Sequence, residues 1–219
     1  MKFALLNGER KEAEANIQGA VCQVCKAEVI AKCGDIKIHH WAHKSNKECP
    51  HWWENETKWH RDWKNHFPLE WQEIVHTSKT GEKHIADIKT PNGLVVEFQH
   101  SSIEKKEVST RNAFYENIIW IVDGKRRKYD ERNLSQHAYD GKSNSRLINE
   151  WGNTGKLIFF DFGKSILPYL EQNIYGNYEV MVTPKKELIK WIYKLSIRGN
   201  LFGNKYNQSN KGFLRNYTM

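Results

Sequence analysis

The sequence of 219 residues contains no apolar run that approaches the length of a membrane span. The apolar stretch at residues 1–8 is too short for a secretory signal. No internal repeat is present, and the only cysteines are four that fall between positions 22 and 49. These absences argue against membrane, secreted and repeat proteins, and they predict a soluble, cytoplasmic chain of one or two domains.

The chain has fewer acidic than basic residues. Asp and Glu number 26 against 34 Lys and Arg, which gives a formal net charge of +8 and a pI near 9.2. Such an excess favours a polyanionic partner, and among such partners it favours nucleic acid. Nine Trp, nine Tyr and nine Phe add aromatic weight, and most of these rings are expected to fill the core.

A hairpin is predicted around the turn Pro91-Asn92-Gly93. Both flanks are rich in β-branched residues and alternate in polarity, as strands do. Proline and glycine suit a three-residue loop, which would be closed by Thr90 and Leu94. Counting back from this closure places Asp87 opposite Glu97, with Cβ atoms about 5 Å apart.

Two opposed carboxylates destabilise a sheet unless positive charge lies between them. A divalent cation would supply that charge, and Gln99 lies on the same face two residues beyond Glu97. The alternative is a solvated charge cluster of Asp87, Glu97 and Lys89 on an ordinary hairpin.

Residues 50–67 contain no glycine and open with proline, which predicts a helix. Glu56, His60 and Lys64 are spaced four residues apart along one face of this helix. In isolation such a stripe indicates a salt-bridged exposed face. A second stripe at helical spacing is expected to be buried and consists of Trp52, Trp59 and Trp63.

Further elements follow from the same kinds of pattern. A strand is expected at residues 73–76, and Ser101 with Glu104 forms a capping-box pattern that opens a helix to about Asn117. The apolar run 118–122 predicts a buried strand. Residues 50–123 therefore follow the order helix, strand, strand, strand, helix, strand.

This core resembles the PD-(D/E)xK nucleases with their restriction-endonuclease-like α/β (α+β) fold, and more narrowly the competence protein CoiA family. The resemblance covers about residues 20–123. It implies a Mg²⁺-dependent nuclease in which Gln99 occupies the lysine position of the name-giving motif. The matching residues are His40-Trp41-Ala42-His43, Glu56, His60, Lys64, Asp87, Glu97-Phe98-Gln99, Ser101, Arg111, Tyr115 and the strand that ends at Asp123.

The chemistry of these residues agrees with that implication. Asp87, Glu97 and Glu56 offer the hard oxygen ligands that Mg²⁺ or Mn²⁺ prefers. Gln99 cannot ionise, so it can orient a water but cannot act as a base. His60 is a candidate to hydrogen-bond the substrate or water, with a packed histidine as the alternative.

Basic side chains are candidates to contact phosphate: Lys64 and Arg111 in the core, then Lys125, Arg126 and Arg127 directly after it. The alternative for each is a solvated charge.

A second group of residues has the spacing of a structural zinc site. Cys22 and Cys25 form a CxxC pair, and we prefer His43 and Cys49 as the remaining ligands, with Cys33 or His40 as substitutes. A disulfide is disfavoured in a cytosolic protein, and no thioredoxin-like pattern surrounds the pair. Zinc would fold a segment with too few apolar residues to hold itself together.

The sequence thus divides into a zinc-binding segment (1–49), a nuclease core (50–123), a basic polar linker or insert without strands (124–155) and an α/β extension with a flexible tail (156–219). In the extension we expect a strand at 156–162, a helix from Ser165 interrupted by Pro168, and a further strand and helix. The predicted function is Mg²⁺-dependent hydrolysis of DNA, with RNA as the alternative substrate, in DNA processing, recombination or a phage-related setting. The alternative function is a noncatalytic, zinc-containing protein that binds nucleic acid.

Overall fold

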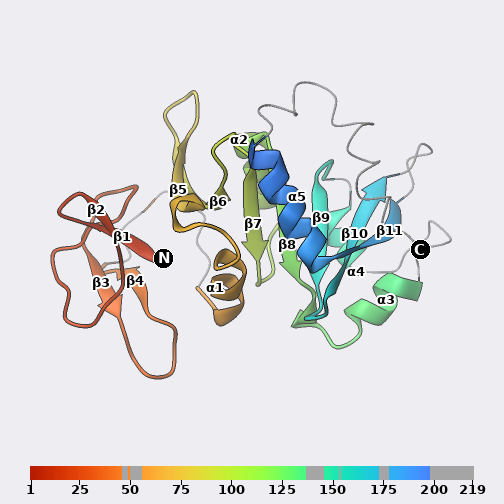
Figure 1. Cartoon of the computed structure of the whole chain (residues 1–219), viewed down its shortest axis with the longest axis horizontal. Coiled ribbons are helices and arrows are strands. Elements are labelled where there is room, and N and C mark those ends of the chain that lie inside the picture. Colours follow the sequence, from red (N-terminus) through yellow and green to blue (C-terminus); the bar gives the residue numbers. More distant parts are fainter. Residues whose placement is uncertain (46–48, 50–55, 137–145, 153, 173–177, 198–219) are drawn as a thin grey trace. The chain divides into compact units, whose positions relative to one another are not determined.

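The computed structural model describes residues 1–45, 49, 56–136, 146–152, 154–172 and 178–197 (Figure 1). Its packing divides the chain into two compact units, Met1–Lys89 and Thr90–Met219, called here the first and second unit. Both units mix strands with a smaller number of helices, so the chain is an α/β protein as expected.

The first unit is built from antiparallel strand pairs and one short helix. Strand β1 pairs with β2, β3 with β4, and β5 with β6. Asn7 and Gly8 both have positive φ angles, of 52° and 88°, which suits the tight two-residue turn between β1 and β2. The elements are β1 (Phe3–Leu6), β2 (Glu9–Glu12), β3 (Val29–Lys32), β4 (His40–His43), α1 (Lys58–Lys64), the 3₁₀ turn η1 (Leu69–Trp71), β5 (Gln72–Thr77) and β6 (Lys83–Lys89).

Small apolar side chains form the core under the first two strand pairs. Trp41 of β4 is fully buried there, and its indole N–H donates to the carbonyl of Lys11 at 2.9 Å. The other members of this core are Met1, Ala4, Ala13, Ala20, Cys22 and Val29.

The second unit contains five neighbouring strands of a sheet, in the order β11-β10-β9-β8-β7. The pairs β7–β8 and β8–β9 are parallel, and the pairs β9–β10 and β10–β11 are antiparallel. The elements are β7 (Val95–Gln99), α2 (Lys105–Tyr115), β8 (Ile118–Asp123), the 3₁₀ turn η2 (Gly124–Arg126), α3 (Asp130–Gln136), α4 (Arg146–Trp151), β9 (Leu157–Asp161), β10 (Ile166–Gln172), β11 (Tyr178–Pro184) and α5 (Lys185–Ile197).

Burial explains this arrangement. Every residue of β8 is buried, as its apolar run predicts for a central parallel strand, and α2 provides the crossover from β7. Helix α5, which crosses in front of the sheet in Figure 1, buries one apolar face. That face consists of Leu188, Trp191, Ile192 and Leu195.

Two helix starts differ from the prediction. Helix α1 begins only at Lys58 with Thr57 as its N-cap, and most of the expected first turns, residues 50–55 with Trp52, lie outside the described residues. Helix α2 begins at Lys105 with Glu104 as its N-cap, so the predicted N-cap at Ser101 is wrong. The Ser101 carbonyl instead accepts a hydrogen bond from the Gln99 side chain at 3.1 Å.

The C-terminal half contains two further differences. The expected helix from Ser165 is a strand, β10, in which Leu167 and Tyr169 alternate with Pro168 and are buried. Pro168 is tolerated because β10 pairs with β9 only from Tyr169 onward. The region predicted as a strandless linker contains helices α3 and α4, and the expected tail after Ile197 lies outside the described residues.

Candidate metal centre and acidic cluster

Three cysteines and one histidine of the first unit bring their ligand atoms together, and we call Cys22, Cys25, His43 and Cys49 the cysteine cluster. Their ligand atoms all lie within 4.8 Å of one another. Cys22 Sγ is 3.8 Å from Cys49 Sγ, and Cys25 Sγ is 3.3 Å from His43 Nε2. Zinc–sulfur bonds of about 2.3 Å in tetrahedral geometry separate two sulfurs by about 3.8 Å. The donor set and its spacing therefore fit a tetrahedral metal centre.

Local backbone geometry places the CxxC segment. The Cys22 N–H donates to the Ala27 carbonyl at 2.9 Å, and the Lys26 N–H donates to the Cys22 carbonyl at 3.2 Å. Lys26 has a φ of 61°, so the chain turns back directly after Cys25. His43 comes from β4, whose pairing with β3 directs the end of that strand to the same place.

Burial changes the acidity of these side chains. It lowers the pKa of His43 and raises the pKa of the Cys22 and Cys49 thiols. Burial would also raise the pKa of Cys25, but the Ala27 backbone and the neighbouring thiols lower it. A neutral imidazole beside one acidic thiol is a suitable starting point for metal ligation.

The two substitute ligands lie outside this cluster. His40 Nδ1 is 2.9 Å from the carbonyl oxygen of Ile38. Cys33 packs against the apolar core of the first unit. The four residues that meet are therefore those preferred from the sequence.

Lys64 lies at the centre of a second group in the first unit, which we call the acidic cluster: Lys64, Glu56, Glu73 and Asp87. Lys64 Nζ is 2.7 Å from Glu56 Oε2, 2.7 Å from Glu73 Oε1 and 3.3 Å from Asp87 Oδ1. Only 2% of the Lys64 side chain is exposed, against 22% for Asp87. The stripe of Glu56 and Lys64 is thus buried and paired, not a solvated face.

Glu73 is a member that the sequence analysis overlooked. In the β5–β6 register, Gln72 pairs with Ile88 and Ile74 with Ala86, so Glu73 falls opposite Asp87 between these pairs. The two opposed carboxylates share the ammonium of Lys64. The register between the strand of Asp87 and the preceding strand is the sequence signal that points to Glu73.

The charge states in the acidic cluster are strongly biased. Burial would raise the pKa of Glu73 and Glu56, but the nearby Lys64 ammonium holds both below their usual range. Burial would lower the pKa of Lys64, but Glu73, Glu56 and Asp87 raise it well above its usual range. The lysine therefore stays cationic and the glutamates stay anionic near neutral pH.

His60 has a structural role at the start of α1. The Thr57 side chain accepts a hydrogen bond from the His60 N–H, and His60 Nδ1 accepts from the Thr57 N–H at 3.4 Å, which is a capping box. The ring is 3% exposed and makes an edge contact with Trp59. Its predicted part in catalysis stays a prediction.

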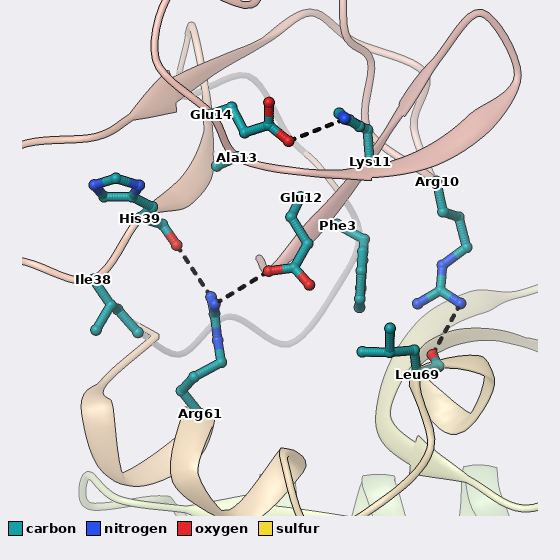
Figure 2. A pocket seen from close by; sticks show the side chains of 10 residues that line it. All are labelled: Phe3, Arg10, Lys11, Glu12, Ala13, Glu14, Ile38, His39, Arg61 and Leu69. Carbon is teal, nitrogen blue, oxygen red and sulfur yellow. Dashed lines mark hydrogen bonds and ion pairs between the residues drawn. The ribbon is translucent and has the colours of Figure 1, made fainter.

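Arg61 connects helix α1 to the N-terminal strands beside a pocket of about 630 Å³ (Figure 2). Its Nε donates to Glu56 Oε1 at 3.0 Å, while its other nitrogens contact Glu12 Oε2 at 3.7 Å and the His39 carbonyl at 3.1 Å. Arg10 at the other side of the pocket donates to the Leu69 carbonyl (Figure 2). Both guanidinium groups of the pocket are thus used in holding the first unit together.

The predicted residues of the second unit lie around Arg111. Its guanidinium contacts Glu97 Oε2 at 3.1 Å and Glu107 Oε1 at 2.5 Å. Glu97 and Gln99 are buried, at 4% and 2% exposure. Gln99 Oε1 has no hydrogen-bond partner among the described protein groups, although the amide nitrogen donates to Ser101. A buried amide oxygen of this kind can accept a hydrogen bond from water or substrate.

The hairpin turn has the expected closure. The Thr90 N–H donates to the Leu94 carbonyl at 2.9 Å, and Gly93 takes a φ of 87°. Asp87 belongs to the first unit and Glu97 to the second, so their pairing stays a prediction.

The basic run after β8 is engaged with acidic side chains. Arg127 contacts Asp130 at 2.6 Å and Glu150 at 2.9 Å, and Arg126 contacts Glu150 at 3.5 Å. Contacts of this run, including Lys125, with phosphate stay predictions.

Comparison with protein families identifies two adjoining regions. Residues 7–51 match the model described as "Competence protein CoiA, N-terminal domain", and residues 56–196 match "Competence protein CoiA, nuclease-like domain". The chain belongs to the CoiA family. The family resemblance seen in the sequence is therefore confirmed. Comparisons of the chain with curated proteins and with solved structures found no match.

The two CoiA regions divide the functional residues between them. The CoiA N-terminal domain includes the cysteine cluster, and the CoiA nuclease-like domain begins at Glu56 and includes the acidic cluster, Glu97 and Gln99. Among the described residues, no helix combines the length and apolar character needed to cross a membrane.

Proposed function

We propose that this chain is a metal-dependent nuclease that hydrolyses DNA phosphodiester bonds, with a place in DNA processing, recombination or a phage-related setting in the cytoplasm. The observation that carries the proposal is the acidic cluster at the start of the nuclease-like domain. There, Glu56 and Asp87 are drawn to one buried ammonium, and Asp87 keeps an exposed fraction of 22%. A solvent-accessible carboxylate beside a buried one, within a family of nuclease-like proteins, supports a metal site.

Mg²⁺ or Mn²⁺ would be held by Asp87, Glu97 and Glu56. These three residues suit the cation because carboxylate oxygens are the hard ligands that Mg²⁺ and Mn²⁺ prefer. When bound, the cation supplies a nucleophile of lowered pKa and neutralises negative charge on the phosphate. The support for grouping Asp87 with Glu97 is the hairpin register that the sequence predicts.

The chain's own side chains would orient the reactants. The buried Gln99 oxygen can accept a hydrogen bond from the attacking water but cannot remove its proton, because an amide does not ionise in this range. Arg111, held between Glu97 and Glu107, fixes the Glu97 carboxylate and is the candidate contact to phosphate. His60 on α1 is the candidate to hydrogen-bond the substrate or the attacking water.

We further propose that the cysteine cluster holds Zn²⁺ as a structural ion. Soft thiolates with one imidazole in tetrahedral spacing are typical of zinc sites that stabilise small domains. The ligands all come from the protein, as in closed structural sites, and they adjoin the small core under β1–β4. Zinc would therefore stabilise the first unit and would not act on the substrate.

A second candidate function is nucleic-acid binding without cleavage. The formal charge of +8 favours it, since binding of a polyanion needs no catalytic carboxylate. Under this alternative, the affinity for nucleic acid falls when basic residues are substituted and does not change when the acidic residues are substituted.

The test is incubation of the zinc-loaded protein with linear and circular, single- and double-stranded DNA and with RNA, in Mg²⁺ or Mn²⁺. We expect cleavage that EDTA and Glu97→Ala abolish. Glu107→Gln is the matched control, because it also removes a carboxylate from Arg111 but is not a proposed metal ligand. Binding of every substrate without cleavage of any would favour the noncatalytic alternative, and equal cleavage by Glu97→Ala would exclude the assigned site.

A further inference from the structure

The three donors of the Lys64 ammonium are matched by three carboxylates. Glu56, Glu73 and Asp87 each accept one contact, at 2.7, 2.7 and 3.3 Å. The ammonium donates hydrogen bonds to Glu56 and Glu73 and forms an ion pair with Asp87, so carboxylates surround it. Lys64 is therefore placed to orient carboxylates and is poorly placed to reach a phosphate.

Removal of this cation would leave like charges crowded together. Glu73 and Asp87 stand opposite one another on β5 and β6, and Glu56 reaches the same ammonium from just before α1. Carboxylates that share a site repel unless a cation separates them. Lys64 sets the direction of Asp87 and Glu56 before any divalent ion arrives.

Glu73 fixes Lys64 in turn. Its carboxylate accepts hydrogen bonds from the backbone N–H of Lys2 at 2.7 and 2.8 Å and of Phe3 at 3.0 Å. Glu73 itself has a φ of 47°, a left-handed conformation that is unusual for this residue type. The strain is consistent with a side chain held from two directions, by β1 and by Lys64.

Strand β1 belongs to the core that also contains the cysteine cluster. Ala4 of β1, Cys22 and Trp41 pack in one group, and Cys25 and Cys49 lie against it. A continuous series of contacts thus leads from the cysteine cluster through β1 to Glu73, then to Lys64 and to Asp87.

Resting on the proposed nuclease function, we propose that Lys64 and Glu73 are positioning residues. They hold Asp87 and Glu56 in the orientation that binds the catalytic cation, and Glu73 makes that orientation depend on strand β1. The N-terminal region is then a working part of the nuclease site as well as a folding module.

The first test uses Glu73→Gln, which keeps the shape of the side chain and one acceptor oxygen but removes its charge. We expect the Mn²⁺ concentration for half-maximal cleavage to rise about 10- to 100-fold, the range typical of residues that orient metal ligands. Glu12→Gln is the control, because Glu12 also joins the N-terminal strands to Arg61 and Lys2 but does not contact Lys64. Its half-maximal concentration should stay within about 2-fold of wild type.

A double-mutant cycle with Lys64→Met separates positioning from general loss of structure. If Glu73 acts through Lys64, Glu73→Gln has no further effect on the Mn²⁺ requirement once Lys64 is methionine. Independent, multiplying effects of the two substitutions would overturn the proposal. Unfolding transitions recorded for each variant establish that it is folded.

Two readouts do not require cleavage. Calorimetric titration of the zinc-loaded protein with Mn²⁺ should show the same weakening in Glu73→Gln. Amide hydrogen exchange at Lys2 and Phe3 should quicken at least about tenfold, while the Leu5 amide, which donates to Val21, stays protected. If the wild-type protein binds Mn²⁺ but does not cleave DNA, only the proposed nuclease function is excluded. If Glu73→Gln leaves both the Mn²⁺ affinity and the amide exchange rates unchanged, the positioning role is excluded.

Discussion

At the scale of single residues, Asp87 was predicted to lie opposite Glu97 with a divalent cation between them, and that pairing stays a prediction. Within the first unit Asp87 lies opposite Glu73 on the neighbouring strand, and the Lys64 ammonium bridges these two carboxylates. The sequence pattern did not indicate that Lys64 is buried among these carboxylates. A Glu56-to-Lys64 spacing is most often solvated, and only tertiary packing buries it.

The acidic cluster predicts a pH dependence of stability. The pKa of Glu73 is lowered on folding, so its stabilisation is present above the ordinary glutamate value of about 4.5 and is lost as the pH falls below it. Glu73→Gln should therefore lower the free energy of unfolding by about 3 kcal/mol at pH 7, and this difference should shrink steadily between about pH 5 and pH 2. Urea unfolding at several pH values measures it.

Glu14→Gln serves as the control, since the Glu14 side chain is 60% exposed and forms an ion pair with Lys11 at the surface. Its effect should stay within about 0.5 kcal/mol at every pH. A Glu73→Gln difference that does not change with pH would contradict the charge assignment.

At the scale of elements, strands were easier to predict than helix starts. The buried run of β8 and the closure of the Thr90–Leu94 turn were both visible in the sequence, because apolar runs and turn residues are local signals. The capping box was placed at Ser101, but the one observed on α1 uses Thr57 and a histidine at the third position. Strand β10 was mistaken for a helix, although it pairs with β9 and β11, the strands directly before and after it in the chain.

Helix α1 carries Arg61 and Lys64, so its N-cap affects the site. Thr57→Ala removes the acceptor for the His60 N–H and should lower the free energy of unfolding by about 1 kcal/mol. Thr57→Ser keeps the hydroxyl and should lose only a few tenths of that amount. Denaturant unfolding compares the three proteins, and equal stability of Thr57→Ala and wild type would show that the cap is unimportant.

At the scale of the whole molecule, the chain combines two regions of the CoiA family with two sets of ligands of opposite kind. Cysteine side chains gather in the N-terminal region and carboxylates in the nuclease-like region, and these donor types match the preferences of the zinc and magnesium ions proposed above. The CxxC spacing predicted that Cys22 and Cys25 meet, because it constrains the backbone locally, whereas the choice of His43 and Cys49 over His40 and Cys33 was a preference that the structure supports. The Glu73 contact with β1 was beyond sequence reasoning because it joins residues 70 apart or more.

Metal analysis tests the N-terminal region. We expect one zinc per chain, lost on Cys25→Ser and retained on Cys33→Ser, since Cys33 lies outside the cysteine cluster. Loss of a structural zinc worth about 3 kcal/mol or more should lower the melting temperature by roughly 6–12 °C. Retention of full zinc by Cys25→Ser would contradict the ligand assignment.

The central claim is that carboxylates of the nuclease-like region perform metal-dependent cleavage, and Asp87→Asn tests it most directly. With DNA cleavage and DNA binding measured in the same Mg²⁺ buffer, the variant should cut about 100-fold more slowly or worse while its affinity for DNA changes by less than about 3-fold. Glu82→Gln, an exposed acid just before β6, should behave as wild type. Undiminished cleavage by Asp87→Asn would contradict the account.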